Sequence, residues 1–106
     1  MITKSQLSVP RQKLLELMQK LNFGRFQQLR LEQGEPVLNP PPLVVQDLKM
    51  GGNNDPRVEI HLRNFTLKQA HVELFHHFDA IQDGVIDEME VRAGLPQMVK
   101  IKRPLI

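Results

Sequence analysis

The clearest chemical potential in this chain lies in carboxylates that cluster at residues 79–90. Carboxylate oxygens are the ligands that hard cations such as Ca²⁺ prefer, and paired carboxylates exchange protons when burial tunes their pKa values. The segment is too polar to promise such burial, so a cation site and a solvated acidic turn are the two interpretations. The clustered carboxylates are Asp79, Asp83, Asp87, Glu88 and Glu90.

Residues 79–90 also resemble the calcium-binding loop of the EF-hand family. Gly84 falls at loop position six, where that loop turns sharply, and acids fall at positions one, five, nine and twelve. The resemblance implies calcium ligation by these acids. Ile81 stands at position three and offers no oxygen, so one ligand of the family pattern is missing. The implied ligands are Asp79, Asp83, Asp87 and Glu90.

Basic side chains suggest a second chemistry, the binding of nucleic-acid phosphates. Such residues on a hairpin and on a terminal strand could contact phosphates while the hairpin enters a groove. A solvated, charged sheet edge explains the same residues without nucleic acid. The net charge of +2 at pH 7 provides no broad basic field. The candidate phosphate ligands are Arg25, Arg30, Lys100, Lys102 and Arg103.

Catalytic residues are scarce. The chain has no cysteine, its two serines, Ser5 and Ser8, lie near the start, and it has no glycine-rich phosphate loop. Glu73 and His77 lie one helical turn apart and could hold a metal, but the sequence fixes no third ligand. We therefore expect a non-catalytic protein with no cofactor and no small-molecule substrate.

The elements that position these residues begin with a helix. Leu14, Met18 and Leu21 recur at helical spacing, Ser8 suits its N-cap, and Pro10 suits its first turn. A second helix is expected to begin at Thr66 and to place an apolar stripe of the same kind in the core.

Alternating apolar residues predict strands around residues 29–31 and 58–62, and the apolar residues within 43–50 predict another. Residues 89–91 are open to two interpretations, a strand of a second hairpin or the outgoing helix of an EF-hand. Prolines at 40–42 are expected to end the return strand of the first hairpin, because proline cannot donate to a ladder. The predicted core contains Leu14, Leu17, Met18, Leu21, Phe26, Leu29, Leu31, Val45, Ile60, Leu74, Phe78, Ile86, Met89 and Val91.

A pattern of two glycines and one proline occurs twice, sixty positions apart. Gly24, Gly34 and Pro36 are matched by Gly84, Gly94 and Pro96. We interpret this as an internal duplication of a helix–strand–turn–strand unit; the alternative is two hairpins that use the same turn chemistry independently. The predicted fold is α+β: two αββ units, with two helices packed on a mostly antiparallel sheet. Repeat one spans about 8–39, the connecting strands and loop 40–64, and repeat two about 65–102.

Length and composition fit one globular domain over residues 1–106, with 41% apolar and 25% charged residues. The first residues do not read as a signal peptide, and no apolar run reaches membrane-spanning length, so we expect a cytoplasmic protein. The expected function is protein–protein interaction or self-association, with residues 43–50 as an edge strand open to strand addition. Nucleic-acid binding and a degenerate calcium site are the alternatives.

Overall fold

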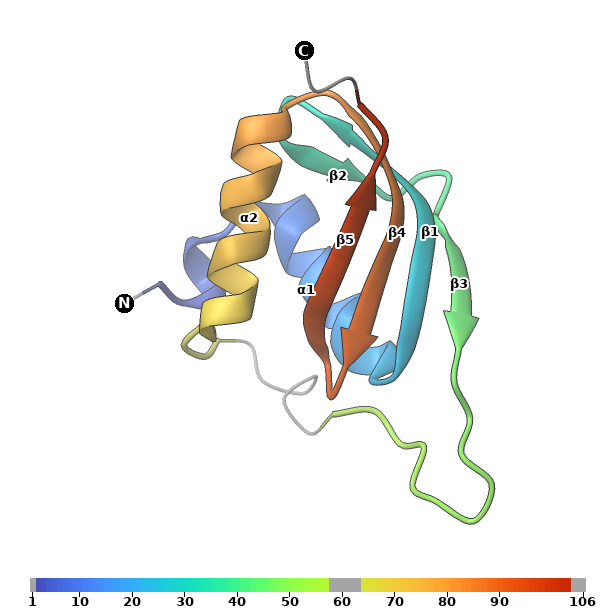
Figure 1. Ribbon diagram of the computed structural model, residues 1–106. Coiled ribbons are helices and arrows are strands. Elements are labelled where there is room, and N and C mark those ends of the chain that lie inside the picture. The colour runs from blue at the N-terminus through green and yellow to red at the C-terminus, as the bar shows by residue number, and fades with distance from the viewer. Residues whose placement is uncertain (1, 58–63, 104–106) are drawn as a thin grey trace.

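The computed structural model describes residues 2–57 and 64–103. The fold is α+β, with two helices packed on a mostly antiparallel five-stranded sheet (Figure 1). Within the described residues no helix is long and apolar enough to cross a membrane. The elements are η1 (Lys4–Gln6), α1 (Val9–Leu21), β1 (Gly24–Glu32), β2 (Glu35–Val37), β3 (Leu43–Gln46), α2 (Gln69–Ile81), β4 (Gly84–Arg92) and β5 (Leu95–Ile101).

Helix α1 begins as predicted and α2 does not. The Ser8 hydroxyl caps α1 by accepting from the Arg11 amide at 3.4 Å. The N-cap of α2 is Lys68, so the prediction of Thr66 is wrong. The reason is that Thr66 pairs with Thr3 in an isolated β-bridge, and the chain turns into the helix only after this extended stretch.

The sheet has the strand order β2-β1-β4-β5, and β3 also pairs with β1. Because β4 occupies one side of β1, β2 and β3 share the other side, β2 along residues 30–32 and β3 along residues 24–27. The predicted break at prolines 40–42 separates them. The prediction that the third strand extends to Met50 is wrong, because Gln46 already pairs with Gly24, the first residue of β1.

The core lies between the two helices and the sheet face that they cover. Most predicted core residues are buried there, and Leu15, Leu67 and Phe75 join them. Leu17 packs partly buried against this cluster. The prediction of Val45 is wrong, because it pairs with Arg25 on the opposite face of the sheet, where it is half-buried. The predicted strand at 58–62, with its core residue Ile60, lies outside the described residues.

The two halves of the fold have corresponding boundaries. Adding sixty to the bounds of α1 and β1 gives the bounds of α2 and β4. The helices end on residues with similar positive φ, 64° at Asn22 and 62° at Gln82. Backbone hydrogen bonds also cross between the halves: the Gly34 amide donates to the Gln82 carbonyl at 2.7 Å, and the Gly94 amide donates to the Asn22 carbonyl at 3.0 Å. Each hairpin turn is therefore held by the end of the other half's helix.

Candidate interaction surface

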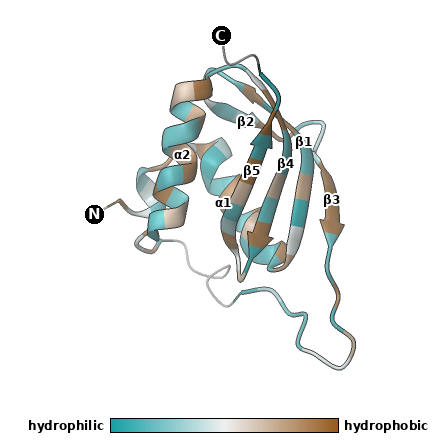
Figure 2. Ribbon diagram, in the orientation of Figure 1, coloured by the Kyte–Doolittle hydropathy of each residue, from teal (hydrophilic) through white to brown (hydrophobic). Residues whose placement is uncertain are grey.

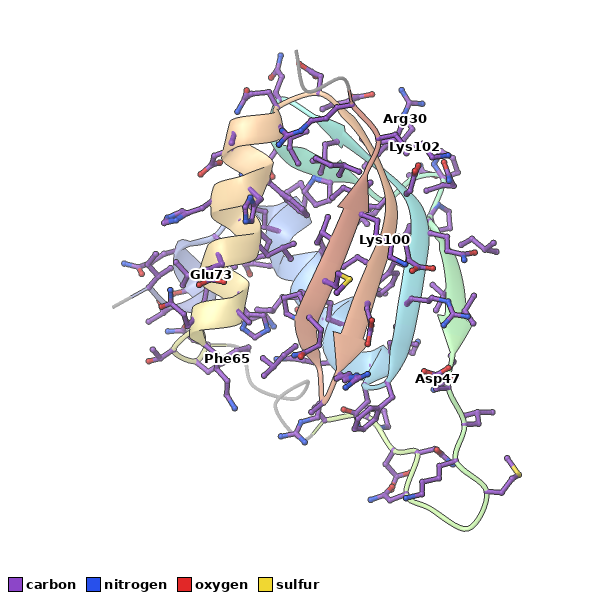
Figure 3. All side chains as sticks on the ribbon, in the orientation of Figure 1. Arg30, Asp47, Phe65, Glu73, Lys100 and Lys102 are labelled. Carbon is purple, nitrogen blue, oxygen red and sulfur yellow. The ribbon has the colours of Figure 1, made fainter. Side chains whose placement is uncertain are left out.

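The predicted phosphate-binding residues gather on the sheet face that the helices leave open. Phe26, Leu29 and Leu31 are buried, and Arg25 and Arg30 lie on the other face. The alternation shifts by one residue at Gln28, whose φ is 58°, so residues before and after it keep the same two faces. Figure 3 shows Arg30, Lys100 and Lys102 on the sheet, away from α2. Arg103 follows β5 and borders a hollow beside α2. The fold thus brings together four of the five basic residues.

Acidic neighbours neutralise these bases. Lys100 Nζ lies 3.1 Å from a Glu88 carboxylate oxygen, and Arg25 Nε lies 3.4 Å from the other oxygen. The hydrogen bond from Lys100 holds the pKa of Glu88 below its usual value. Further ion pairs join Lys102 to Asp87 at 3.6 Å and Arg30 to Glu32 at 3.6 Å. The open face therefore alternates in sign instead of forming a basic patch.

The carboxylates predicted as calcium ligands are spread over a helix end and a strand. Asp79 lies on α2 and pairs with Arg11, while Asp83 accepts a hydrogen bond from the Gln33 amide at 3.1 Å. Asp87 and Glu90 lie on β4 in ion pairs. In the described part of the chain, no three His, Asp or Glu side chains gather as a metal site would require. This arrangement gives the four acids no shared coordination point.

Strand β3 presents an apolar edge. Its exposed fractions are 64% at Leu43 and 47% at Val44, and Figure 2 shows the strand in hydrophobic colours. The Asp47 amide donates to the Phe23 carbonyl at 2.9 Å, so by the alternation of an antiparallel ladder the backbone groups of Val44 and Gln46 point away from β1. No strand among the described residues pairs with that side.

A groove runs along α1 beside this edge, formed by two adjoining hollows that share Leu17 and Lys20. We call it the α1 groove. One hollow has a volume of about 690 Å³ and lies between α1 and the chain around Leu38. The other, of about 390 Å³, lies beneath Val44. These volumes fall in the range of sites that bind ligands or peptide side chains.

The corresponding hollow between α2 and β5 is smaller, about 280 Å³. The difference follows from the strands. Strand β5 runs unbroken along β4 and its residues Val99 and Ile101 pack against the core. On the other side the chain leaves the sheet between β2 and β3, at residues 38–42, and this gap opens the α1 groove.

The chain beyond β3 forms an arm, residues 47–56, that projects away from the sheet (Figure 1). Its return is tied to α1, because Asn22 Nδ2 donates to the Asp55 carbonyl at 3.1 Å and the Arg57 amide donates to the Gln19 carbonyl at 2.9 Å. Two apolar side chains on the arm are exposed, Leu48 at 56% and Met50 at 82%.

Three charged side chains beside the groove have no ion-pair partner among the described residues, whereas Glu16, which also lines the groove, pairs with Lys4 at 2.8 Å. Lys13 and Lys20 border the groove on α1, and Asp47 opens the arm at the end of β3 (Figure 3). Within the described ranges 2–57 and 64–103, none of these three takes part in an ion pair, in contrast to the bases on the open sheet face. The groove and its surroundings therefore combine apolar exposure with free charge.

Sequence reasoning identified β3 as an edge and missed the α1 groove. The groove forms where Leu17 and Leu38 come together in the fold. The two residues lie far apart in the sequence, and a leucine by itself does not indicate a binding site. Two signals were present: three successive prolines that break a strand, and apolar residues that continue past the strand to Met50.

The chain matches no protein-family model, and no curated protein and no solved structure is significantly similar to it.

Proposed function

We propose that this protein is a non-catalytic binding module that acts through protein–protein contact, self-association included, along β3 and the α1 groove. The observation that carries the proposal is the concentration of exposed apolar side chains on β3 and the arm, beside a sheet face whose charges are paired. Large apolar side chains that gather at one edge of a fold mark interaction surfaces.

The edge of β3 also suggests the mode of binding. The outward backbone groups of Val44 and Gln46 can bond to an added strand, while the α1 groove can receive side chains of that strand. Backbone bonds would supply affinity, and the groove would supply selectivity.

The test compares Val44→Lys with Val85→Lys. Val44 lies on the edge, whereas Val85 is similarly exposed on the open face, opposite Arg30 on the inner strand β1. The immobilised wild-type protein should retain partner proteins, and light scattering should show that the free protein self-associates. Both properties should be lost in Val44→Lys and kept in Val85→Lys. Unchanged circular dichroism spectra establish that both variants are folded. Equal retention by both variants would overturn the proposal.

Nucleic-acid binding is our second proposal, supported by the shared open face of Arg25, Arg30 and Lys100. The interleaved Glu88 opposes it, because this acid faces two of those bases. A fluorescence titration with DNA and RNA duplexes in low and high salt decides the matter, since phosphate contacts weaken steeply with salt. An affinity that is absent in low salt, or insensitive to salt, removes this candidate.

We also propose that the two halves arose by internal duplication of an αββ unit. The support is the common offset of sixty residues in helix bounds, strand bounds and cap geometry. If the two hairpins had arisen independently, nothing would require α1 and α2 to be separated by the same sixty residues. A search for natural chains that carry one unit tests this proposal.

A further inference from the structure

We propose that the occupant of the α1 groove is the arm of a second copy of this chain, so that two copies exchange arms. This inference rests on the proposed function and names the partner. It would place Leu48 and Met50 of one copy in the groove of the other.

The groove and the arm both expose apolar side chains. Leu17 and Leu38 bound the groove and are only partly buried, while Leu48 and Met50 on the arm are exposed in their own chain. Exchange would cover both sets at once, and burial of large apolar side chains is the main favourable term in association.

The charges of the arm and of the groove are also complementary. Asp47 leads into the arm, Lys13 and Lys20 border the groove, and none of the three is ion-paired with a residue that the structure describes. The hollow beside α2 has Glu73 in place of Lys13, at the position sixty residues further on. Arg103 lines that hollow as well, so its charges balance and it has no net positive charge to attract Asp47. The α1 groove stays net positive through Lys13 and Lys20 even with Glu16 counted, so charge favours the arm at α1.

The arm also begins and ends beside the α1 groove. The arm leaves the sheet at Gln46 and returns past Asn54, and both residues border the groove of their own chain. A two-fold axis beside β3 would therefore bring each arm to the partner's groove. Such a contact is the same for both copies and closes on itself as a dimer, so it does not propagate into a filament.

The test is a charge exchange measured by sedimentation equilibrium of the full chain over roughly a thousandfold range of concentration. The wild-type chain should dimerise. Asp47→Lys and Lys13→Glu should each raise the dimer dissociation constant about tenfold or more, because each places like charges together in both symmetric contacts. An equimolar mixture of the two variants should restore dimerisation as a heterodimer, since each arm then meets an opposite charge.

Glu73→Lys is the matched control, because it reverses a charge at the corresponding place on α2; it should leave the dimer unchanged. Met50→Ser should weaken the dimer by about tenfold or more through lost apolar burial. A wild-type chain that stays monomeric throughout overturns arm exchange, and so does a dimer that neither charge reversal weakens. In both cases the proposed function is decided separately, by the loss or retention of partners in the Val44→Lys variant.

Discussion

Arg11 joins three parts of the molecule through one guanidinium group. From α1, its Nη2 donates to the Gly34 carbonyl at 2.9 Å and pairs with Asp79 on α2, while its Nε lies 3.7 Å from Glu35. The group also stacks over the Phe75 ring at 5.3 Å. One side chain thus ties both helices to the first hairpin turn.

Replacement of Arg11 by methionine should lower the free energy of unfolding by about 1–3 kcal/mol, the cost of losing charged hydrogen bonds at a largely buried position. The partial exposure of both carboxylates keeps the figure below that of a fully buried pair. Arg92→Met is the control, because Arg92 pairs with Glu90 but is 68% exposed against 13% for Arg11. It should change stability by less than about 0.5 kcal/mol. Denaturant titration that gives equal effects would contradict this account.

His71 stands sixty positions after Arg11 and contacts the corresponding turn, with Nε2 3.4 Å from the Gly94 carbonyl oxygen. Burial lowers the pKa of His71 below 6.5, the nearby Lys68 charge adds to this, and the bond to Gly94 opposes it. One half of the fold therefore holds its turn with a permanent cation, and the other with an imidazole that titrates.

The lowered pKa of His71 predicts a pH dependence of stability. As pH falls through 6.5 the unfolded chain binds a proton before the folded chain does, so stability is complete above 6.5 and declines toward the folded-state pKa. The melting temperature should therefore fall as the pH is lowered below 6.5. His71→Leu should flatten this slope, while His77→Gln, on the exposed face of α2, should retain it. A wild-type slope that survives His71→Leu would exclude His71 as its source.

At the scale of elements, the close approach of β3 to β1 depends on Gly24. A Cβ at Gly24 would lie 2.2 Å from the Val45 carbonyl oxygen. Gly84 is the corresponding residue, with φ of 159° against 154°, and a Cβ there would meet only Ile81 at 3.6 Å. The two glycines share a backbone conformation, and β3 crosses only Gly24.

Gly24→Ala should therefore destabilise the fold more than Gly84→Ala does. Both variants carry the same backbone strain, so the difference, about 1–3 kcal/mol, measures the displacement of β3 from β1. Thermal unfolding gives the stability difference. Hydrogen exchange at the amides of Val45 and Asp47, which face β1, should rise only in Gly24→Ala. Equal effects of the two variants would show that the contact with Val45 does not hold β3.

The accuracy of sequence reasoning also differs between elements. Helix α1 was predictable because Ser8 and the leucine spacing are local signals, and β1 was predictable from alternation. The prediction of Thr66 as an N-cap failed because its bridge partner, Thr3, is remote in sequence. The prediction of Val45 as a core residue failed because the sequence of a strand does not say which of its two faces is covered. The α1 groove depends on which strand pairs with which, and this information lies in no single segment.

At the scale of the whole molecule, the two halves meet through the pairing of β1 with β4 at the centre of the sheet. Buried residues of both halves form one cluster, so neither half has a core of its own. The pairing of β1 with β4 and the shared core therefore join the two halves more extensively than the covalent connection through the arm does.

Cutting the chain in the arm should leave the molecule assembled. A protease site inserted between Gly52 and Asn53, which are exposed, would be cleaved without unfolding. The two fragments should then elute together from a gel-filtration column, and should separate only in denaturant. Fragments that separate under native conditions would contradict the description of a shared core.

The crossed hydrogen bonds of Gly34 and Gly94 have a consequence for ancestry. Each turn amide bonds to the carbonyl at the end of the other half's helix, so in a chain with a single unit these groups would face water in place of a protein partner. Two such short chains, joined through their long strands, would restore both bonds. If the halves descend from one unit, as we propose, pairing of half-length chains would have formed these contacts, and fusion would have converted a bond between molecules into a bond within one.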